Sequence, residues 1–223
     1  MVDDNNSVKT LGSPARSTIL TNPATAMAER PMRHCLFLLA SLLLTTVATS
    51  NATTVVKNLD LKRYMGRWYE IARFPTFFEK SNAVDTRATY TLNDNGTVHV
   101  LNEDFVDGKR SYVEGIAYKA DPKSDEAKLK VKFYVPPSVP IFPVIGDYWV
   151  LYIDQDYQNA VVGGPTKIFL WILSRKSHID DATYKELVEK AKNEGYDVSK
   201  LRKTPQSEKP PPAAEEGRTL SIS

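Results

Sequence analysis

Eight short segments of alternating apolar and polar residues constrain the fold of this chain more than any other feature. They recur at roughly ten- to fifteen-residue intervals and are separated by turn sequences, such as Asn-Asp-Asn-Gly at 93–96 and Asp-Gly at 107–108. Short strands joined by tight turns predict an antiparallel barrel or sandwich. The predicted strands are residues 68–74, 86–92, 97–103, 111–119, 128–135, 148–154, 159–163 and 168–175.

The clearest alternation lies in segment 128–133, where three lysines alternate with Leu129, Val131 and Phe133. A one-residue shift in pairing would bury the lysines, so the register of this strand is strongly fixed. A single helix is predicted after the last strand, capped by Asp180 or Asp181 and ended by Gly195. Its apolar stripe follows the helical spacing i, i+3, i+4, i+7 and consists of Tyr184, Leu187, Val188 and Ala191.

The chain divides into four parts by composition. Residues 1–31 are rich in small and hydroxyl-bearing side chains and are predicted to be a disordered leader. Residues 32–52 combine a basic start, a short apolar core and a small-residue end, which predicts a secretory signal peptide; an uncleaved anchor or a buried strand is the alternative. Residues 53–204 carry the strands and the helix, and 205–223 form a Pro- and Glu-rich tail predicted to be disordered.

Charge and cysteine content exclude several classes of protein. The 29 basic and 27 acidic residues give a net charge of +2, and no basic run suggests nucleic-acid binding. The one cysteine, Cys35, lies in the predicted signal peptide, which excludes a disulfide framework and a cysteine-based zinc site. The three histidines lack the spacing of metal ligands. We therefore expect neither a metal nor a cofactor.

Three motifs occur in order along the predicted strands. Residues 66–72 (GRWYEIA) resemble the first signature of the lipocalin family, 156–157 (DY) the second and 170–175 (LWILSR) the third, although Gln155 replaces the threonine usual before the second. The resemblance spans about 55–206 and is strongest to plant temperature-induced lipocalins, which group with bacterial Blc and animal apolipoprotein D. That plant group lacks a cleavable signal, so the leader departs from its pattern. The signature residues are Gly66, Trp68, Asp156, Tyr157 and Arg175.

The resemblance implies an eight-stranded antiparallel up-and-down barrel with one C-terminal helix packed outside. It implies that Trp68 closes one end of the barrel, with Arg175 lying across it. It further implies a monomer or weak dimer that binds and transports a small hydrophobic ligand, associates with membranes, and protects them under temperature or oxidative stress. With the leader in use, the protein would be secretory or extracellular at the plasma membrane; without it, on the cytosolic face of that membrane.

Alternation within the barrel predicts which side chains face the ligand. The inward positions include small residues on some walls and aromatic residues on others, as in a tapered apolar pocket for a fatty acid, lysophospholipid or isoprenoid. A dry, filled core is the alternative. Ala72 and Tyr152 share the inward parity. The predicted ligand-binding residues are Ala88, Tyr90, Val98, Val100, Asn102, Val113, Ala117, Val131, Phe133, Tyr148, Val150, Phe169 and Trp171.

The connection 135–146 is apolar and carries four prolines. Proline removes ladder donors, so a loop rather than a strand is expected here. An exposed apolar loop predicts an interaction surface, and we expect it to contact a membrane; a lid over the pocket is the alternative. The predicted membrane residues are Val139, Ile141, Phe142, Val144 and Ile145.

Enzyme motifs are absent from the sequence: it has no nucleophile elbow, phosphate-binding loop or HExxH. Only Glu70 with Tyr148 could form an acid–base pair inside the barrel, and Arg73 is the alternative partner for this carboxylate. We therefore expect a carrier rather than an enzyme. A lipid-modifying isomerase or de-epoxidase on this fold, or a membrane-surface protein without a ligand, are the alternatives.

Overall fold

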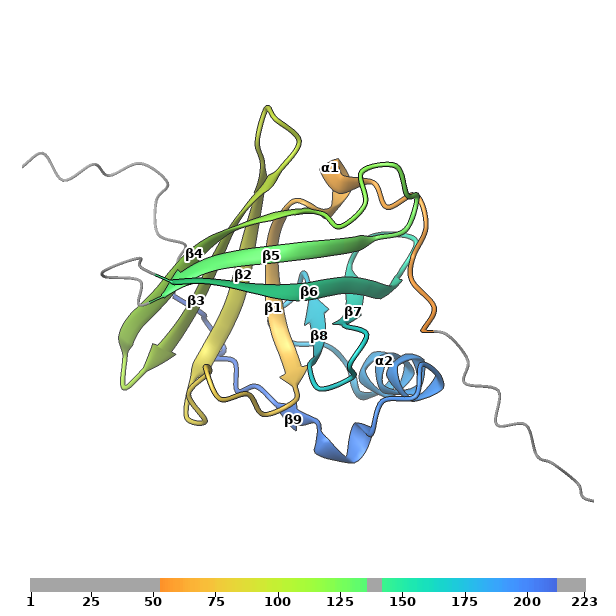
Figure 1. Ribbon diagram of the computed structural model, residues 1–223. Helices are drawn as coiled ribbons and strands as arrows, with labels where there is room; N and C mark the ends of the chain where they lie inside the picture. Colours follow the sequence, from red (N-terminus) through yellow and green to blue (C-terminus); the bar gives the residue numbers. More distant parts are fainter. Residues whose placement is uncertain (1–52, 136–141, 212–223) are drawn as a thin grey trace, which may run out of the picture. The chain divides into compact units, whose positions relative to one another are not determined.

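The computed structural model describes residues 53–135 and 142–211 (Figure 1). The predicted leader and signal peptide, the loop residues Val139 and Ile141, and the tail from 212 onward lie outside the described residues. Within the described part, no helix is long and apolar enough to cross a membrane.

The strands form one closed antiparallel barrel, which confirms the predicted fold. Each strand pairs with the next along the chain, and β1 pairs with both β8 and β2, which closes the ring. A ninth strand of two residues adds to the end of β1. The strands are β1 (Gly66–Arg73), β2 (Val84–Leu92), β3 (Val98–Val106), β4 (Lys109–Lys119), β5 (Lys128–Val135), β6 (Phe142–Ile153), β7 (Asn159–Gly163), β8 (Leu170–Ser174) and β9 (Arg202–Lys203).

The register of β5 follows from its alternation. Leu129 and Val131 are buried, while Lys130 reaches out to Asp147 of β6, with 2.6 Å between Nζ and Oδ1. The Lys128 ammonium lies 4.6 Å from the centre of the Trp149 ring on the outer face. Because one face of this strand is apolar and the other is charged, only one pairing register keeps the lysines in water.

The helices lie outside the barrel (Figure 1). Helix α1 (Leu61–Tyr64) precedes β1, α2 (Asp181–Asn193) follows β8, and a 3-10 turn spans Val198–Lys200. Asp180 caps α2 as predicted, accepting a 2.8 Å hydrogen bond from the Thr183 backbone N–H. Leu187 and Ala191 are the buried part of the apolar stripe.

Tyr196 fastens the segment after α2 to the barrel. Its hydroxyl donates to the Gly164 carbonyl and accepts from the Gly164 N–H, both at 2.9 Å. A Cβ atom at Gly163 would lie 2.2 Å from that hydroxyl, so only glycine allows this close approach. The helix is thereby held against the outer face near β7.

Two β-bulges change the inward parity. Between Glu70 and Ala72 the β1–β8 register shifts. Ala72 then pairs with Lys203, which lies on the outer face because its ammonium is 4.4 Å from the centre of the Tyr184 ring on α2. A second shift follows Val150, so the Tyr152 hydroxyl points to Glu186 of α2 at 3.4 Å. The prediction that Ala72 and Tyr152 face inward is therefore wrong, because a bulge adds one residue and reverses the alternation.

The segment after Pro140 also differs from the prediction. Residues 142–146 are not loop but the first part of β6, paired with residues 131–135 of β5. Strand β7 pairs with β6 only over Trp149–Ile153, so this earlier part of β6 has no β7 ladder on its other side. A proline such as Pro143 is tolerated in a strand where one side needs no ladder donors.

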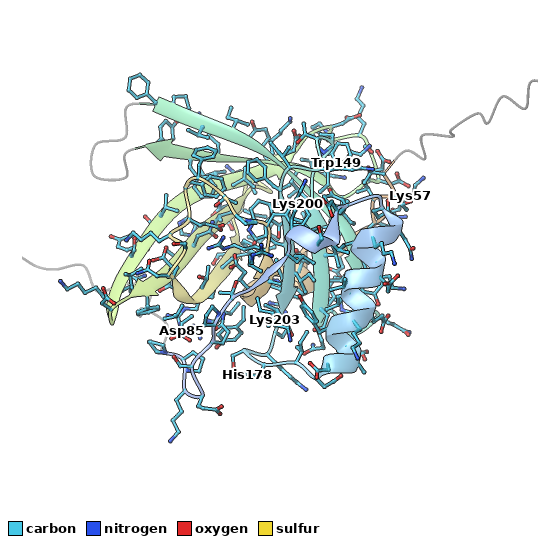
Figure 2. The ribbon with its side chains drawn as sticks, turned by 90° about the horizontal axis from the view of Figure 1, so that it is seen from below. Lys57, Asp85, Trp149, His178, Lys200 and Lys203 are labelled. Atoms are coloured by element: carbon cyan, nitrogen blue, oxygen red, sulfur yellow. The ribbon has the colours of Figure 1, made fainter. Side chains whose placement is uncertain are left out.

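The first part of the C-terminal tail is ordered against the barrel, contrary to the prediction for 205–211. The Gln206 side chain donates to the Glu70 carbonyl at 2.9 Å and to the Thr86 carbonyl at 3.1 Å. Ser207 donates its backbone N–H and its hydroxyl to the Asp85 carboxylate, each at 2.6 Å. Figure 2 shows the segment running from Lys200 past Lys203 toward Asp85. These contacts, rather than apolar burial, hold a Pro- and Glu-rich sequence in place.

Candidate ligand-binding site

The closed end of the barrel is built on Trp68, which is fully buried. Its indole N–H donates to the Tyr64 carbonyl at 2.9 Å, and the Arg175 guanidinium lies 3.8 Å from the centre of its ring. Arg175 donates to the carbonyls of Arg67 at 2.7 Å and Arg63 at 2.8 Å. The structure thus places Trp68 and Arg175 together, with Arg175 tying β8 to the turn before β1.

The other signature residues support this end. Gly66 has φ +91°, and a Cβ there would lie 3.4 Å from an Arg175 guanidinium nitrogen. Tyr157 has φ +59°, its hydroxyl accepts from the Asp60 N–H at 3.0 Å, and its carbonyl accepts from Arg175 at 3.2 Å. Asp156 contributes its backbone carbonyl, which accepts from the Gln158 amide at 3.1 Å. All these contacts join loops at one end of the barrel.

Three tyrosine hydroxyls meet just inside the closed end. The Tyr148 hydroxyl lies 2.8 Å from that of Tyr64 and 3.0 Å from that of Tyr90. The Tyr64 and Tyr90 rings stack at 5.8 Å between centres. The Tyr148 hydroxyl is therefore hydrogen-bonded to two other tyrosines. It does not form the acid–base pair with Glu70 on which the enzyme alternative rested.

The predicted ligand-binding residues share the inner face of the barrel. Residues directly opposite each other in a ladder point to the same face, and a chain of such pairs starts from Trp68. It runs through Ala88–Asn102–Val113, Tyr90–Val100–Gly115–Phe133–Val144, Val98–Ala117–Val131 and Val150–Val162–Trp171, while the Phe169 ring stacks on Trp171 at 5.8 Å.

Solvent exposure differs between the two ends of this inner face. Tyr90, Val98, Val100, Ala117, Val131 and Val150 are buried, and most of them lie near the closed end. The remaining predicted residues are only half-buried although they point inward. Solvent thus reaches these inner side chains. They are Ala88, Asn102, Val113, Phe133, Tyr148, Phe169 and Trp171.

A charged cluster lies toward the other end of the barrel, and the prediction had named only part of it. Arg73 Nε lies 3.1 Å from Glu70 Oε1 and 3.2 Å from Glu79 Oε2, so one guanidinium serves two carboxylates. The Thr204 hydroxyl also donates to Glu70. Trp171 Nε1 donates to Glu79 at 3.4 Å. Arg73 is thus the partner of Glu70. Glu79 was missed because it follows a strand end in an irregular loop.

Burial raises the pKa of Glu70 to about 8; repulsion from Glu79 adds to this, and Thr204 and Arg73 offset it only in part. The folded protein therefore keeps this proton up to about pH 8, whereas the unfolded chain releases it near about 4.3. Between these values the unfolded state binds fewer protons, so stability falls by about 1.4 kcal/mol per pH unit.

We expect the melting temperature of the Glu70→Gln variant to fall less steeply between pH 5 and pH 8 than that of the wild type. The amide cannot ionise in either state, so this share of the pH dependence disappears. Parallel melting curves for the two proteins, followed by circular dichroism, would contradict a proton held on Glu70.

Exposed apolar side chains surround the end of the barrel opposite Trp68. Figure 1 shows the β5 and β6 ends and the β3–β4 hairpin on the same side of the molecule. Three of the exposed residues were missed because they stand singly or as a pair in short loops. We call this set the apolar rim: Phe77, Phe78, Phe142, Val144, Ile145 and Ile168, with Phe77 90% exposed and Phe142 65% exposed.

Metal ligation finds no support within residues 53–135 and 142–211, which hold no group of three or more His, Cys, Asp or Glu side chains suited to a metal ion. The polar groups of the inner face include tyrosine hydroxyls, Asn102, Asp104 and the Arg73 cluster. This arrangement can bind an apolar chain and make a few directed hydrogen bonds.

Comparisons with known proteins agree with this geometry. Residues 59–206 match a family described as a lipocalin-like domain. The chain is 69% identical over 157 residues to temperature-induced lipocalin-1 of Arabidopsis thaliana, covering 70% of this chain and 84% of that protein. It is 42% identical over 150 residues to outer membrane lipoprotein Blc of Escherichia coli K12, covering 66% and 80%.

More distant relatives share the same region. Identity to mouse apolipoprotein D is 37% over 165 residues, covering 70% of this chain and 82% of that protein. Among solved structures, insecticyanin from the tobacco hornworm Manduca sexta superposes with a TM-score of 0.57 at 25% identity, covering 70% of this chain and 85% of that one.

Proposed function

This chain belongs to the lipocalin family, whose members bind small hydrophobic ligands, and we propose that it carries a fatty acid, lysophospholipid or isoprenoid inside its barrel. The supporting observation is the gradient of exposure along one continuous inner face. Most inner side chains toward the Trp68 end, such as Tyr90 and Val98, are buried, whereas Val113, Phe133 and Trp171 point inward and still meet solvent. Apolar inner walls reached by solvent from one end suit an alkyl or isoprenoid chain.

Burial of such a chain supplies enough free energy for binding. Each CH₂ group transferred from water contributes about 0.8 kcal/mol. A sixteen-carbon chain thus gives on the order of 10 kcal/mol before ordering costs, so micromolar or tighter affinity is expected.

Filling the interior tests the proposal. We expect Val113→Trp to weaken binding of a fluorescent fatty-acid probe at least tenfold, because the larger side chain takes up space inside the barrel. Tyr112→Trp is the matched control, since Tyr112 is the next residue of β4, faces outward and is 54% exposed. Titration of both variants would contradict the proposed site if they bound the probe equally well.

Native mass spectrometry of protein purified without added lipid separates this function from the alternatives. A co-purified amphiphile supports a carrier. An empty barrel that still binds vesicles would favour a membrane-surface protein without a ligand. Turnover of a bound lipid would favour an enzyme.

We propose that the apolar rim contacts a membrane, which would let ligand pass without crossing water. Phe142 and Ile145 are both more than half exposed, and Phe77 and Phe78 are exposed in the β1–β2 loop at the same end of the barrel. Exposed apolar side chains gathered in one region mark interaction surfaces. The names of two relatives, outer membrane lipoprotein Blc and temperature-induced lipocalin-1, support a membrane-associated role in temperature stress.

Exchange of Phe142 and Ile145 for serine should reduce co-sedimentation with phospholipid liposomes severalfold, because these side chains would no longer enter the bilayer surface. Tyr118→Ser serves as control, since Tyr118 is also an outward, 36% exposed side chain of β4 but pairs with Lys130, farther from the rim than the row that joins Lys132 to Ile145. Equal sedimentation of the rim variant and the control would contradict membrane contact here.

A further inference from the structure

The tyrosine cluster at the closed end has one more hydroxyl donor than it has hydrogen bonds. Tyr64 comes from α1, Tyr90 from β2 and Tyr148 from β6, and two hydrogen bonds join their three hydroxyls. Each hydroxyl has one proton to donate. Among the residues that the structure describes, none of the three hydroxyls has a further hydrogen-bond partner. One O–H donor is therefore left over, whichever way the two bonds run.

These hydroxyls stay protonated throughout the physiological range. Burial raises the pKa of Tyr90 to about 12, and it raises the pKa values of Tyr64 and Tyr148 well above their ordinary range. The surplus group is thus a neutral donor rather than a phenolate. Once a ligand displaces water from the inner face, a donor without an acceptor is costly, so the ligand is expected to supply an acceptor.

The cluster borders the accessible interior. Tyr148 pairs with Leu129 on the inner face and is half-buried, while Tyr64 and Tyr90 are almost fully buried behind it. Phenylalanine at these positions would fill the closed end with the same rings and leave no unsatisfied donor. Packing alone therefore does not account for three hydroxyls at one point.

We propose that the tyrosine cluster is a deep subsite for an oxygen acceptor at the far end of the ligand. The ligand class would be an amphiphile or isoprenoid whose inner end carries a hydroxyl or keto oxygen rather than a plain methyl group. This inference rests on the proposed function, because it requires a chain bound inside the barrel.

The distance from the rim suits such a ligand. Tyr148 lies six residues from Phe142 along β6, which corresponds to about 20 Å of strand at ~3.3 Å per residue. Strands in barrels of this kind tilt, so the depth is somewhat smaller. Chains of roughly twelve to sixteen carbons would span it.

Lysophosphatidylcholines with and without a terminal hydroxyl on the acyl chain test the subsite. Their bulky zwitterionic headgroup stays at the mouth, so the chain end is directed inward. Each compound, with acyl chains of twelve to sixteen carbons and kept below its critical micelle concentration, competes with a fluorescent probe. We measure the ratio of the two dissociation constants, hydroxylated over plain, in the wild type, in Tyr148→Phe and in Tyr152→Phe.

We expect this ratio to be about tenfold higher in Tyr148→Phe than in the wild type at the best-fitting chain length, because Tyr148 carries the hydroxyl that borders the accessible interior, whereas Tyr64 and Tyr90 are almost fully buried. Tyr152→Phe should keep the wild-type ratio, since its hydroxyl lies outside the barrel beside Glu186. Thermal melting checks that both variants fold; if Tyr148→Phe does not, Tyr148→Leu takes its place.

The outcomes separate this inference from the proposed function. If the plain compound binds and the ratio is the same in all folded variants at every chain length, the deep subsite is overturned while the carrier function stands. If neither compound binds the wild type, the carrier function itself fails, and the subsite with it.

Discussion

Replacing Trp68 by alanine should lower the free energy of unfolding by about 3–5 kcal/mol, the range for removing a fully buried large aromatic side chain. Trp68 has no exposed surface, and its N–H bond to Tyr64 would be lost together with its ring. Arg175 would also lose the surface on which it lies at 3.8 Å. Urea unfolding followed by circular dichroism measures the change.

The effect should be on stability and not on ligand preference. Trp149→Ala is the control, because Trp149 is a tryptophan of comparable size on the outer face, half-buried beside Lys128. Trp149→Ala should lower the free energy of unfolding clearly less than Trp68→Ala does. Equal losses for the two variants, or a changed order of ligand affinities in a folded Trp68→Ala protein, would contradict the assignment of Trp68 to the closure of the barrel.

A second large effect is expected at Glu103, whose carboxylate is completely buried on the outer side of β3 beneath the C-terminal segment. It accepts from Arg87 at 3.1 and 3.3 Å and from Arg110 at 2.7 Å. Glu103→Gln leaves the buried Arg87 charge without this carboxylate and should cost about 3–5 kcal/mol. Glu114→Gln, at an exposed carboxylate on β4, should change stability little.

The double variant Glu103→Leu with Arg87→Met sharpens this test. Replacing both charges by apolar groups of similar size removes the uncompensated charge, so much of the loss should be regained. Burial acts to raise the pKa of Glu103, but hydrogen bonds from Arg87 and Arg110 outweigh it and lower that pKa. The wild-type pair therefore stabilises the fold above about pH 4.3 and loses this contribution as pH falls through the lowered pKa. A double variant no more stable than Glu103→Gln would contradict the proposed cause.

Most of the barrel could be predicted from the sequence because its strands alternate strictly. The parity of β5, fixed by its lysines, extends across the ladders and predicts inward positions as far away as Asn102 and Trp171. The N-cap and the apolar stripe of α2 could also be predicted, because both depend only on residues close together in the sequence. Trp68 and Arg175 could be paired only through the family resemblance, since 107 positions separate them in the sequence.

The errors have physical causes that alternation does not register. A bulge in β1 and another in β6 turn Ala72 and Tyr152 outward, and nothing in their local sequence marks the extra residue. Residues 205–211 are ordered by hydrogen bonds to Asp85, Thr86 and Glu70, which a composition rule for disorder does not count. Pro143 suggested a loop. It is tolerated in β6 because this part of the strand has no β7 ladder that would need its missing N–H donor.

The contact between β1 and β2 has a consequence for how the protein is made. These strands pair over only four residues, from Gly66 with Tyr90 to Tyr69 with Arg87. Beyond Tyr69, the partners of β1 on this side are β9 and the segment that follows it, rather than β2. During synthesis the first and last pieces of this join leave the ribosome more than a hundred residues apart. The barrel therefore stays unsealed along one side until the segment from Arg202 to Gln206 has been made, and its interior is the last part of the domain to be enclosed.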